Sequence, residues 1–176
     1  MEMLRTVAKA WKIPDIRKKI LFTLAMLFIF RIGSQIPVPG MDREVLANTF
    51  DSDTGLFALF NLFSGGAFSN FTIFALSITP YITASIIMQL LAIALPSVEK
   101  LQKEGTEGRK KIIRITRYMT VVLAIIQAIG VSIGLFRQAL ISTDAFSVTV
   151  IVLVLAAGTA FLMWLGEQIN EHGIGN

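Results

Sequence analysis

The sequence contains no cysteine and only one histidine, His172. Without cysteine, the chain forms no disulfide, no CxxC redox motif and no thiolate metal site. His172 lies near Glu167 and Glu171, but one imidazole and two loosely spaced carboxylates are too few ligands for a credible metal site. No serine–histidine dyad or pair of carboxylates falls within an apolar run. We therefore expect no catalytic residue, no metal and no cofactor, and we expect that the chain is not an enzyme.

Charged residues are also scarce, at 16% of the chain, whereas a soluble domain usually carries about 25%. The apolar fraction is 54% and the mean hydropathy is +0.68. This composition excludes a disordered chain and argues against an ordinary soluble enzyme. The net charge of +4 could indicate nucleic-acid binding, but the basic residues lie at the edges of apolar runs. That arrangement is typical of membrane topology instead.

Four apolar runs are long enough to span a bilayer, which requires roughly 20 mostly apolar residues. They cover residues 20–36, 71–95, 115–135 and 145–165. The segments between them are an external loop over 37–70, a basic loop over 96–114, a short external loop over 136–144 and a tail over 166–176. Pro80 removes a backbone donor and should bend the second span. The fold class we expect is all-α, a polytopic membrane helix bundle.

The positions of lysine and arginine predict the orientation of these spans. Six basic residues precede the first run, and seven lie between the second and third runs or at the start of the third. The other two loops carry only Arg43 and Arg137, and Arg31 lies within the first run. Because basic residues are retained on the cytoplasmic side, we expect the N-terminus, the 96–114 loop and the C-terminus in the cytoplasm.

Residues 1–19 form a different kind of element. Leu4, Val7, Ala8 and Trp11 recur at helical spacing, with basic residues between them. This pattern predicts an amphipathic helix that lies in the cytoplasmic membrane interface. A basic leader that only sets topology explains the same residues.

The segment from Gly55 to Gly66 is apolar and helix-forming but too short to cross a bilayer. Ser64-Gly65-Gly66 breaks this helix before the second span. Irregular backbone at membrane depth is tolerated only where protein buries it or where it lines a cavity. The segment therefore predicts either a re-entrant half-helix, over about 55–63, or an external helix that rests on the membrane.

The second span is too polar for a helix that faces lipid. Ile78, Ile82, Ser85 and Gln89 share one face, and Gln127 adds an amide to the third span. Such groups usually face the protein interior or a water-filled path, although plain hydrogen bonding between helices also explains each of them. Arg31 is costly within a span, and near its outer end it should extend to the interface.

Several long motifs, in order, carry a resemblance to a known family. They are FRIGSQIPVPG (30–40), FSGGA (63–67), ITPYITAS (78–85), KEGTEGRK (103–110) and WLGEQ (164–168), followed by HGIGN (172–176). With these motifs the chain resembles the N-terminal part of bacterial SecY, the channel subunit of the Sec protein translocon. The resemblance implies ten spans in two inverted halves, of which this chain would supply the first four. The chain is then expected to be a fragment, one piece of a divided protein or the ordered portion before a break, and by itself it should not form a sealed channel.

The resemblance also implies roles for individual residues. The re-entrant half-helix would be a plug that closes the pore from outside, and the glycine break would be its hinge. The plug and hinge residues would be Leu56, Phe57, Leu59, Phe60, Phe63, Ser64, Gly65 and Gly66. Ile78 and Ile82 would belong to an aliphatic pore ring, and Thr83 and Gln127 to a lateral gate. Lys103, Arg109, Lys110 and Lys111 would face cytoplasmic partners.

The implied function is the movement of unfolded secretory polypeptides across, and membrane segments laterally into, the bacterial plasma membrane. The implied partners are SecE, SecG, the SecA ATPase, the ribosome, signal sequences, translocating polypeptides, membrane lipid and the C-terminal half of the same protein. The alternative is a fragment of a secondary transporter, since broken helices and intramembrane amides also mark those proteins. A transporter should hold convergent charged groups near the midplane, and only Arg31 is available.

Overall fold

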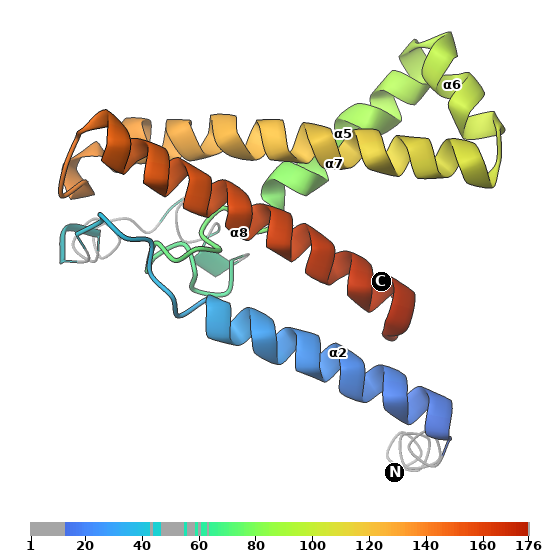
Figure 1. Cartoon of the computed structure of the whole chain (residues 1–176), viewed down its shortest axis with the longest axis horizontal. Helices are drawn as coiled ribbons and strands as arrows, with labels where there is room; N and C mark the ends of the chain where they lie inside the picture. Colours follow the sequence, from blue (N-terminus) through green and yellow to red (C-terminus); the bar gives the residue numbers. More distant parts are fainter. Residues whose placement is uncertain are drawn as a thin grey trace.

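The computed structural model describes residues 13–42, 44–46, 55, 59, 61–62 and 64–175, with Leu135 described by its backbone alone. Five helices organise this part of the chain (Figure 1). They are α2 (Pro14–Gly33), α5 (Thr79–Ala94), α6 (Pro96–Lys103), α7 (Thr106–Ile129) and α8 (Ala145–His172). A π-helical segment (Gly130–Leu135) and a 3-10 turn (Arg137–Ala139) follow α7. The described residues form no strand, so the all-α prediction is confirmed.

Helix α2 begins and ends at residues suited to those positions. Pro14 lies in the first turn, where its missing N–H has no helical partner to lose. At the other end, the ring of Phe74 occupies the space where a side chain on Gly33 would be. The buried hydroxyl of Ser34 donates to the Arg31 carbonyl at 2.8 Å. The helix therefore stops where the chain must pass close to a ring from another segment.

The second predicted span is helical only in its later part. Residues 64–78 form a series of turns, and α5 begins at Thr79 rather than near Phe71. Proline fits the first turn of a helix, where its missing N–H has no helical partner, whereas further inside a helix it would break the hydrogen-bond pattern, so a helix that contains Pro80 begins close to it. Pro80 thus lies in the first turn of α5, and the prediction that it would bend a longer helix is wrong. Phe71 and Ser77 have positive φ values of 43° and 53°, which make the preceding turns tight.

The basic segment between the second and third runs is helical rather than a loop. Helices α5 and α6 meet at Leu95 with a bend of 102°. Gly105, with a φ of 75°, then turns the chain back into α7. The Leu101 carbonyl of α6 occupies the space where a side chain on Gly108 would be. Two glycines therefore let α6 fold tightly against the start of α7.

Helices α5 and α7 both bury residues at every fourth position, and in α7 all of them are small. Helix α7 buries Thr116, Thr120, Ala124 and Ala128, each four residues apart. Thr116 and Thr120 donate their hydroxyls to carbonyls one turn earlier in the same helix, at 2.9 and 2.8 Å. Helix α5 buries Ala84, Met88 and Ala92 at the same spacing. Small residues at every fourth position allow the close helix approach that is common in membrane proteins.

Two described helices are long and apolar enough to cross a membrane, Thr106–Gly134 and Ala145–His172. A third is added if the bent pair of α5 and α6 counts as one span. Helix α2 carries Arg17, Lys18 and Lys19 in its first turns and Arg31 in its last, so less of its length is apolar. Helix α8 continues to His172, well into the predicted 166–176 tail.

A hydrophobic core lies where residues 36–42 and 68–76 cover α7 and α8. Residues 36–42 run between two other segments, because Val38 N–H donates to the Phe71 carbonyl at 3.0 Å and Asp42 N–H to the Ala139 carbonyl at 2.7 Å. Phe71 and Phe136 pack edge to face at 5.3 Å between ring centres. Thirteen buried residues make up the core: Val38, Met41, Leu46, Phe68, Phe71, Ala75, Leu76, Ala128, Phe136, Ala139, Ile151, Val152 and Leu155.

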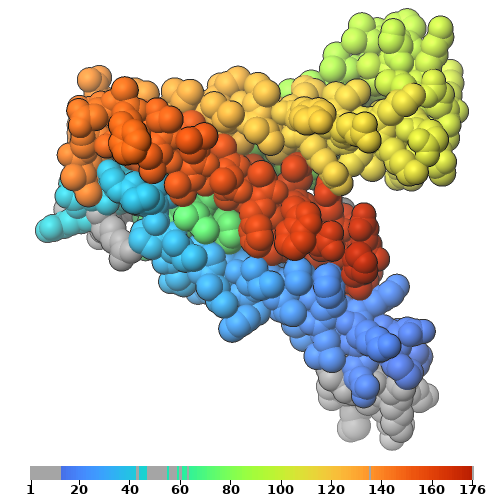
Figure 2. Space-filling model, in the orientation of Figure 1, coloured from blue at the N-terminus to red at the C-terminus, as the bar shows by residue number. Residues whose placement is uncertain are grey.

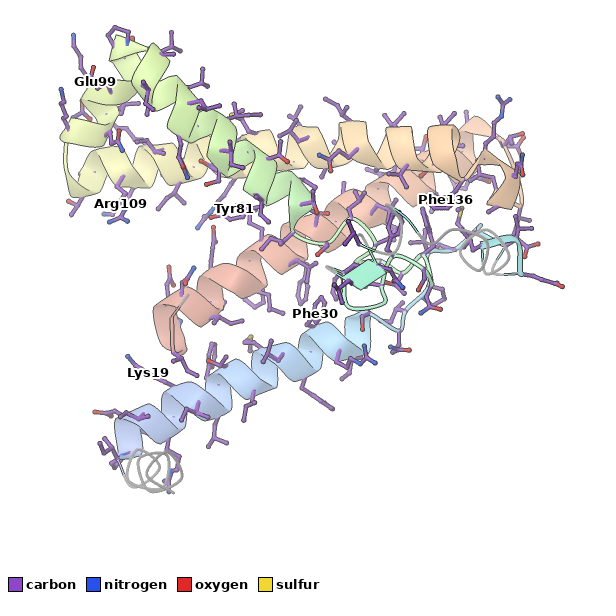
Figure 3. All side chains as sticks on the ribbon, turned by 180° about the vertical axis from the view of Figure 1, so that it is seen from behind. Lys19, Phe30, Tyr81, Glu99, Arg109 and Phe136 are labelled. Carbon is purple, nitrogen blue, oxygen red and sulfur yellow. The ribbon has the colours of Figure 1, made fainter. Side chains whose placement is uncertain are left out.

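Helix α8 lies at the centre of the bundle. It fills the space between α7 on one side and α2 on the other (Figure 2). The start of α2, the α6–α7 corner and the end of α8 lie at one end of the molecule, at the right of Figure 1. Lys19 and Arg109 therefore share an end, and Phe136 lies at the opposite end (Figure 3).

Candidate functional site

The glycine break is an ordered turn stabilised by its own polar groups. Gly65 and Gly66 have φ values of 61° and 87°, which glycine adopts without the strain that other residues incur. Gly66 N–H donates to the Asn61 carbonyl at 3.0 Å, and Ser69 N–H to Asn61 Oδ1 at 3.2 Å. The buried hydroxyl of Ser64 accepts from Phe68 N–H at 3.0 Å. The break is therefore a hydrogen-bonded structure, and not merely an interruption of a helix.

A stack of aromatic rings supports this turn. Ala67, next to the glycines, is fully buried beside Phe74. Phe74 stacks on Phe30 of α2 at 5.7 Å and on Phe161 of α8 at 5.9 Å between ring centres. The turn thus lies beside Phe74, whose ring contacts both α2, through Phe30, and α8, through Phe161. Phe30 lies near the end of its helix (Figure 3).

The predicted half-helix lies mostly outside the described residues. Leu56, Phe57, Phe60 and Phe63 are among those outside. Leu59, Asn61 and Leu62 are described and helical, and Leu59 and Leu62 are exposed. The described part therefore contains the predicted hinge residues Ser64, Gly65 and Gly66, with only the end of the segment that precedes them.

The start of α5 positions the two predicted pore residues. The Ile78 carbonyl accepts hydrogen bonds from the N–H groups of Tyr81 and Ile82, at 3.0 and 3.1 Å. Ile78 is partly buried, and its Cδ1 lies 3.9 Å from where a side chain on Gly166 would begin. Ile82, one turn later, is 50% exposed. The two isoleucines thus lie one turn apart, and about half of the Ile82 surface is not covered by other described residues.

The two predicted gate residues lie on different helices, Thr83 on α5 and Gln127 on α7. Both are partly buried. The hydroxyl of Thr83 donates to the Thr79 carbonyl of its own helix at 3.0 Å. The described contacts include no hydrogen bond between Thr83 and Gln127. The hydrogen bond of the Thr83 hydroxyl therefore stays within α5 and does not join the two helices.

A groove of about 590 Å³ lies between α5, α6 and α7, and sequence reasoning did not predict it. Tyr81, Ser85 and Gln89 line its α5 side, and Arg109 lines its α7 side. Figure 3 shows Tyr81 on α5 and Arg109 near the start of α7. Ser85 and Gln89, expected to share a face with Ile82, therefore line a groove that Ile82 does not. The sequence signals that could have predicted this groove are Pro96 and Gly105, because they lie at the two bends that fold α6 back onto α7.

The basic corner keeps most of its charge in contact with solvent. Three lysines pair with glutamates on exposed side chains: Lys103 with Glu99, Lys110 with Glu107, and Lys111 with Glu104. Exposed pairs of this kind contribute little to stability, typically below about 1 kcal/mol. These lysines therefore remain available to an external partner. Among the described residues, no group of three His, Cys, Asp or Glu side chains could hold a metal ion.

Comparison with known proteins shows the family of the chain. Residues 72–176 match the SecY protein family. The protein translocase subunit SecY of Halalkalibacterium halodurans is 52% identical over 178 residues, which cover 99% of this chain and 41% of that protein. The corresponding subunit of Bacillus subtilis is 50% identical over 179 residues, with the same coverage of both chains. The chain thus spans about two-fifths of the length of these relatives.

Solved structures share the fold at lower sequence identity. Sec61 in the canine ribosome-channel complex aligns with a TM-score of 0.66 and 20% identity, over 97% of this chain and 38% of its own. A SecY structure aligns with a TM-score of 0.63 and 19% identity, over 96% of this chain and 37% of its own. In that protein the plug domain is described as stabilising the closed state of the translocation channel and maintaining a membrane seal. Because the family match and the relatives together extend over almost the whole sequence, the chain belongs to the SecY family.

Proposed function

We propose that this chain is the N-terminal part of a protein-conducting channel in the bacterial plasma membrane. The channel moves unfolded secretory polypeptides across the membrane and releases membrane segments laterally into it. The observation that carries this proposal is the 52% identity to a protein translocase subunit over 99% of the chain. The relatives do not support the alternative of a secondary transporter.

In this proposal Ile78 and Ile82 contribute to the constriction of the pore. Aliphatic side chains make no directional contacts, so a ring of them deforms around polypeptides of many sequences. The same apolar ring resists ions and water, as hydrophobic constrictions do in other channels. The partial exposure of Ile82 supports this role, because half of its surface has no neighbour among the described residues. The remaining ring residues belong to the other half of the protein.

The segment before Ser64 is proposed as the plug, and the turn at Ser64–Gly66 as its hinge. The related SecY structure assigns closure and sealing to a plug domain. Two glycines at positive φ provide a turn that few other residues could form. Thr83 and Gln127 are proposed as gate residues, because a polar amide lowers the packing advantage of a closed apolar helix pair. A signal sequence then competes more easily for that position.

The remaining partners follow from the same assignment. Lys103, Arg109, Lys110 and Lys111 are proposed to face cytoplasmic partners, the SecA ATPase or the ribosome, while SecE, SecG and the C-terminal half of the protein complete the channel. Their exposed position at the corner of α6 and α7 supports this orientation. The chain itself is proposed to have no catalytic role, so the energy for translocation comes from the partner. The four spans would then cross the membrane with the N-terminus in the cytoplasm.

The proposal is tested by photocrosslinking in the complete channel, reconstituted with its other half and a stalled secretory polypeptide. A photoreactive residue at Ile82 is compared with one at Leu153 on α8, which is exposed to a similar degree, 59% against 50%. We expect the polypeptide to crosslink several times more strongly at Ile82, because that position would line the pore. Equal crosslinking at the two positions, or labelling of lipid alone at Ile82, would contradict the pore assignment.

A further inference from the structure

The groove between α5, α6 and α7 combines one positive charge with polar and apolar surface. Among the described residues that line it, Arg109 is the only charged one, and none is acidic. Tyr81, Ser85 and Gln89 follow one another at intervals of one helical turn on α5. Met88 of the same helix is buried and adds an apolar surface. The groove therefore suits an occupant that carries negative charge, hydrogen-bonding groups and some apolar surface.

Arg109 differs from the lysines around it because it has no partner of its own. Lys103, Lys110 and Lys111 each pair with a glutamate of the same corner. The described contacts give the guanidinium of Arg109 no ion pair and no hydrogen bond. A carboxylate that approaches a lysine must compete with the glutamate already there. A carboxylate that enters the groove pairs with Arg109 without displacing another group.

The backbone that carries Arg109 is held in place before any partner binds. The Leu101 carbonyl of α6 lies directly against Gly108 of α7, which is buried. The N–H of Arg109 donates to the Gly105 carbonyl at 3.0 Å, in the turn that joins the two helices. A binding group on a rigid support loses less entropy when its ligand binds. The corner of α6 and α7 thus presents Arg109 at a defined place beside the groove.

A protein segment fits this groove better than a lipid tail or a nucleic acid does. The volume of about 590 Å³ lies within the range of about 300–1,000 Å³ that is common for ligand pockets. A lipid tail would cover the polar ends of Tyr81 and Gln102 and leave them without hydrogen-bond partners, which is unfavourable. A nucleic acid needs several cations to neutralise successive phosphates, and the groove supplies one. A protein segment supplies carboxylates, backbone groups and apolar side chains together.

We infer that the groove binds an acidic segment of a cytoplasmic partner protein, with Arg109 pairing with a carboxylate of that segment. The inference rests on the proposed function, in which this corner faces the SecA ATPase or the ribosome. The corner lies at the basic end of the bundle, with the starts of α2 and α7 (Figure 1). Arginine presents two parallel N–H groups to a carboxylate, so the pairing also selects the orientation of the segment. Arg109 thus determines specificity, and the surrounding lysines add to the attraction between the two proteins.

The direct test measures affinity for two purified probes, the SecA ATPase and the ribosome. The complete channel is placed in nanodiscs of zwitterionic lipid, so that anionic lipid does not contribute. We expect Arg109→Gln to weaken the binding of one probe about tenfold, because a hydrogen-bonded charge pair is lost. The matched control is Lys110→Gln, which removes the neighbouring exposed charge that already pairs with Glu107 and should change affinity less than about twofold. Equal affinities of the two variants for both probes would overturn the inference.

Photocrosslinking identifies what occupies the groove. A photoreactive residue at Gln102, which lines the groove, is compared with one at Ser97, which is also exposed on the α6 side but does not line it. We expect the partner protein to crosslink several times more strongly at Gln102, through a segment that contains Asp or Glu. Replacing that acidic residue with Lys should restore the binding that Arg109→Glu loses. Crosslinks from Gln102 to lipid, to ribosomal RNA or to the C-terminal half of the same protein would overturn the inference.

These measurements separate the groove from the channel assignment. If the native channel moves a secretory polypeptide but Arg109→Gln binds both probes like the native protein, the role of the groove is wrong and the channel assignment stands. If the native assembly binds a probe through Arg109 but moves no polypeptide, the channel assignment fails and the role of the groove stands. A native channel that binds neither probe would overturn the inference about the groove.

If Arg109→Gln does not assemble, Arg109→Lys replaces it in the affinity measurement. Lysine keeps the charge but lacks the flat guanidinium fork, so it should bind a carboxylate less tightly than arginine does. An Arg109→Lys channel with native affinity for both probes would overturn the inference.

Discussion

Glycine residues allow segments of this protein to pass close to one another at positions where a side chain would not fit. Gly158 of α8 lies directly against the Ile73 carbonyl, and Gly33 at the end of α2 lies against the ring of Phe74. Both contacts involve the 73–74 segment, which passes between the two helices. A side chain at either position would push this segment away from the bundle. The aromatic stack of Phe30, Phe74 and Phe161 depends on the same close approach.

Gly158→Ala should therefore destabilise the protein. The added methyl group would overlap a backbone carbonyl, which moves less easily than the end of a flexible side chain. Overpacking of this kind costs about 1–3 kcal/mol. Thermal unfolding of the complete channel in detergent should show a lower midpoint. Gly130→Ala is the control, because its backbone is helical and a methyl group there would meet no atom within 4 Å. A drop in midpoint as large in Gly130→Ala as in Gly158→Ala would show that the crossing is not the cause.

At the scale of elements, α7 and α8 are joined at their basic end by one ion pair. Arg117 of α7 donates from Nε to Glu167 Oε1 at 2.7 Å, and its second nitrogen lies 2.7 Å from Oε2. The glutamate side chain is only 19% exposed. Such two-point pairing fixes the relative rotation of two helices, because both bonds form only in one orientation.

A double-mutant cycle on Arg117→Ala and Glu167→Gln should give a coupling free energy of about 1 kcal/mol, discounted because the arginine is half exposed. Equilibrium unfolding of the complete channel in detergent measures it. The control pair is Lys110 and Glu107, which lies within α7 and is exposed at both ends. Its coupling should be below about 0.5 kcal/mol. Similar coupling in the two pairs would contradict a special role for the contact between α7 and α8.

At the scale of the whole molecule, charge is divided between the two ends of the bundle. The start of α2, the α6–α7 corner and the end of α8 share one end, and the described basic residues other than Arg31 and Arg137 lie there or in the adjoining turns. The opposite end carries Asp42, Glu44 and Asp144 with Arg137. A bilayer around this bundle would retain the basic end in the cytoplasm.

Membrane-impermeant maleimide labelling of single cysteines tests this orientation, in a full-length protein whose other cysteines are replaced. Cysteine at Ser97, in exposed α6, should react only in inverted vesicles, because it lies at the basic end. Cysteine at Gln138, exposed at the opposite end, should react only in intact spheroplasts. Labelling of both positions from the same side would contradict the proposed topology.

Features that depend on composition and on local pattern could be predicted from the amino-acid sequence alone. Scarce charge, long apolar runs and an uneven distribution of basic residues are local properties. Helix α8 contains the fourth apolar run, and α7 with the π-helical segment contains the third but begins earlier, at Thr106. The break at Gly65 and Gly66 could also be predicted, because glycine adopts positive φ values that few other residues adopt. The motifs led to the SecY family for the same reason, since each is a short contiguous string.

Other features depend on contacts between residues far apart in the chain, and these could not be predicted from local sequence. The 71–78 segment is as apolar as a helix requires, yet it forms turns because Ile36 and Val38 pair with its backbone and Phe74 packs between α2 and α8. The groove beside Arg109 exists only because α6 folds back onto α7. Arg31 is exposed, as expected, but its guanidinium also donates to the Gly65 carbonyl at 3.2 Å, a contact that exists because aromatic packing places the turn beside α2. A sequence pattern specifies which face of a helix is buried, whereas the partner of that face depends on contacts between residues far apart in the chain.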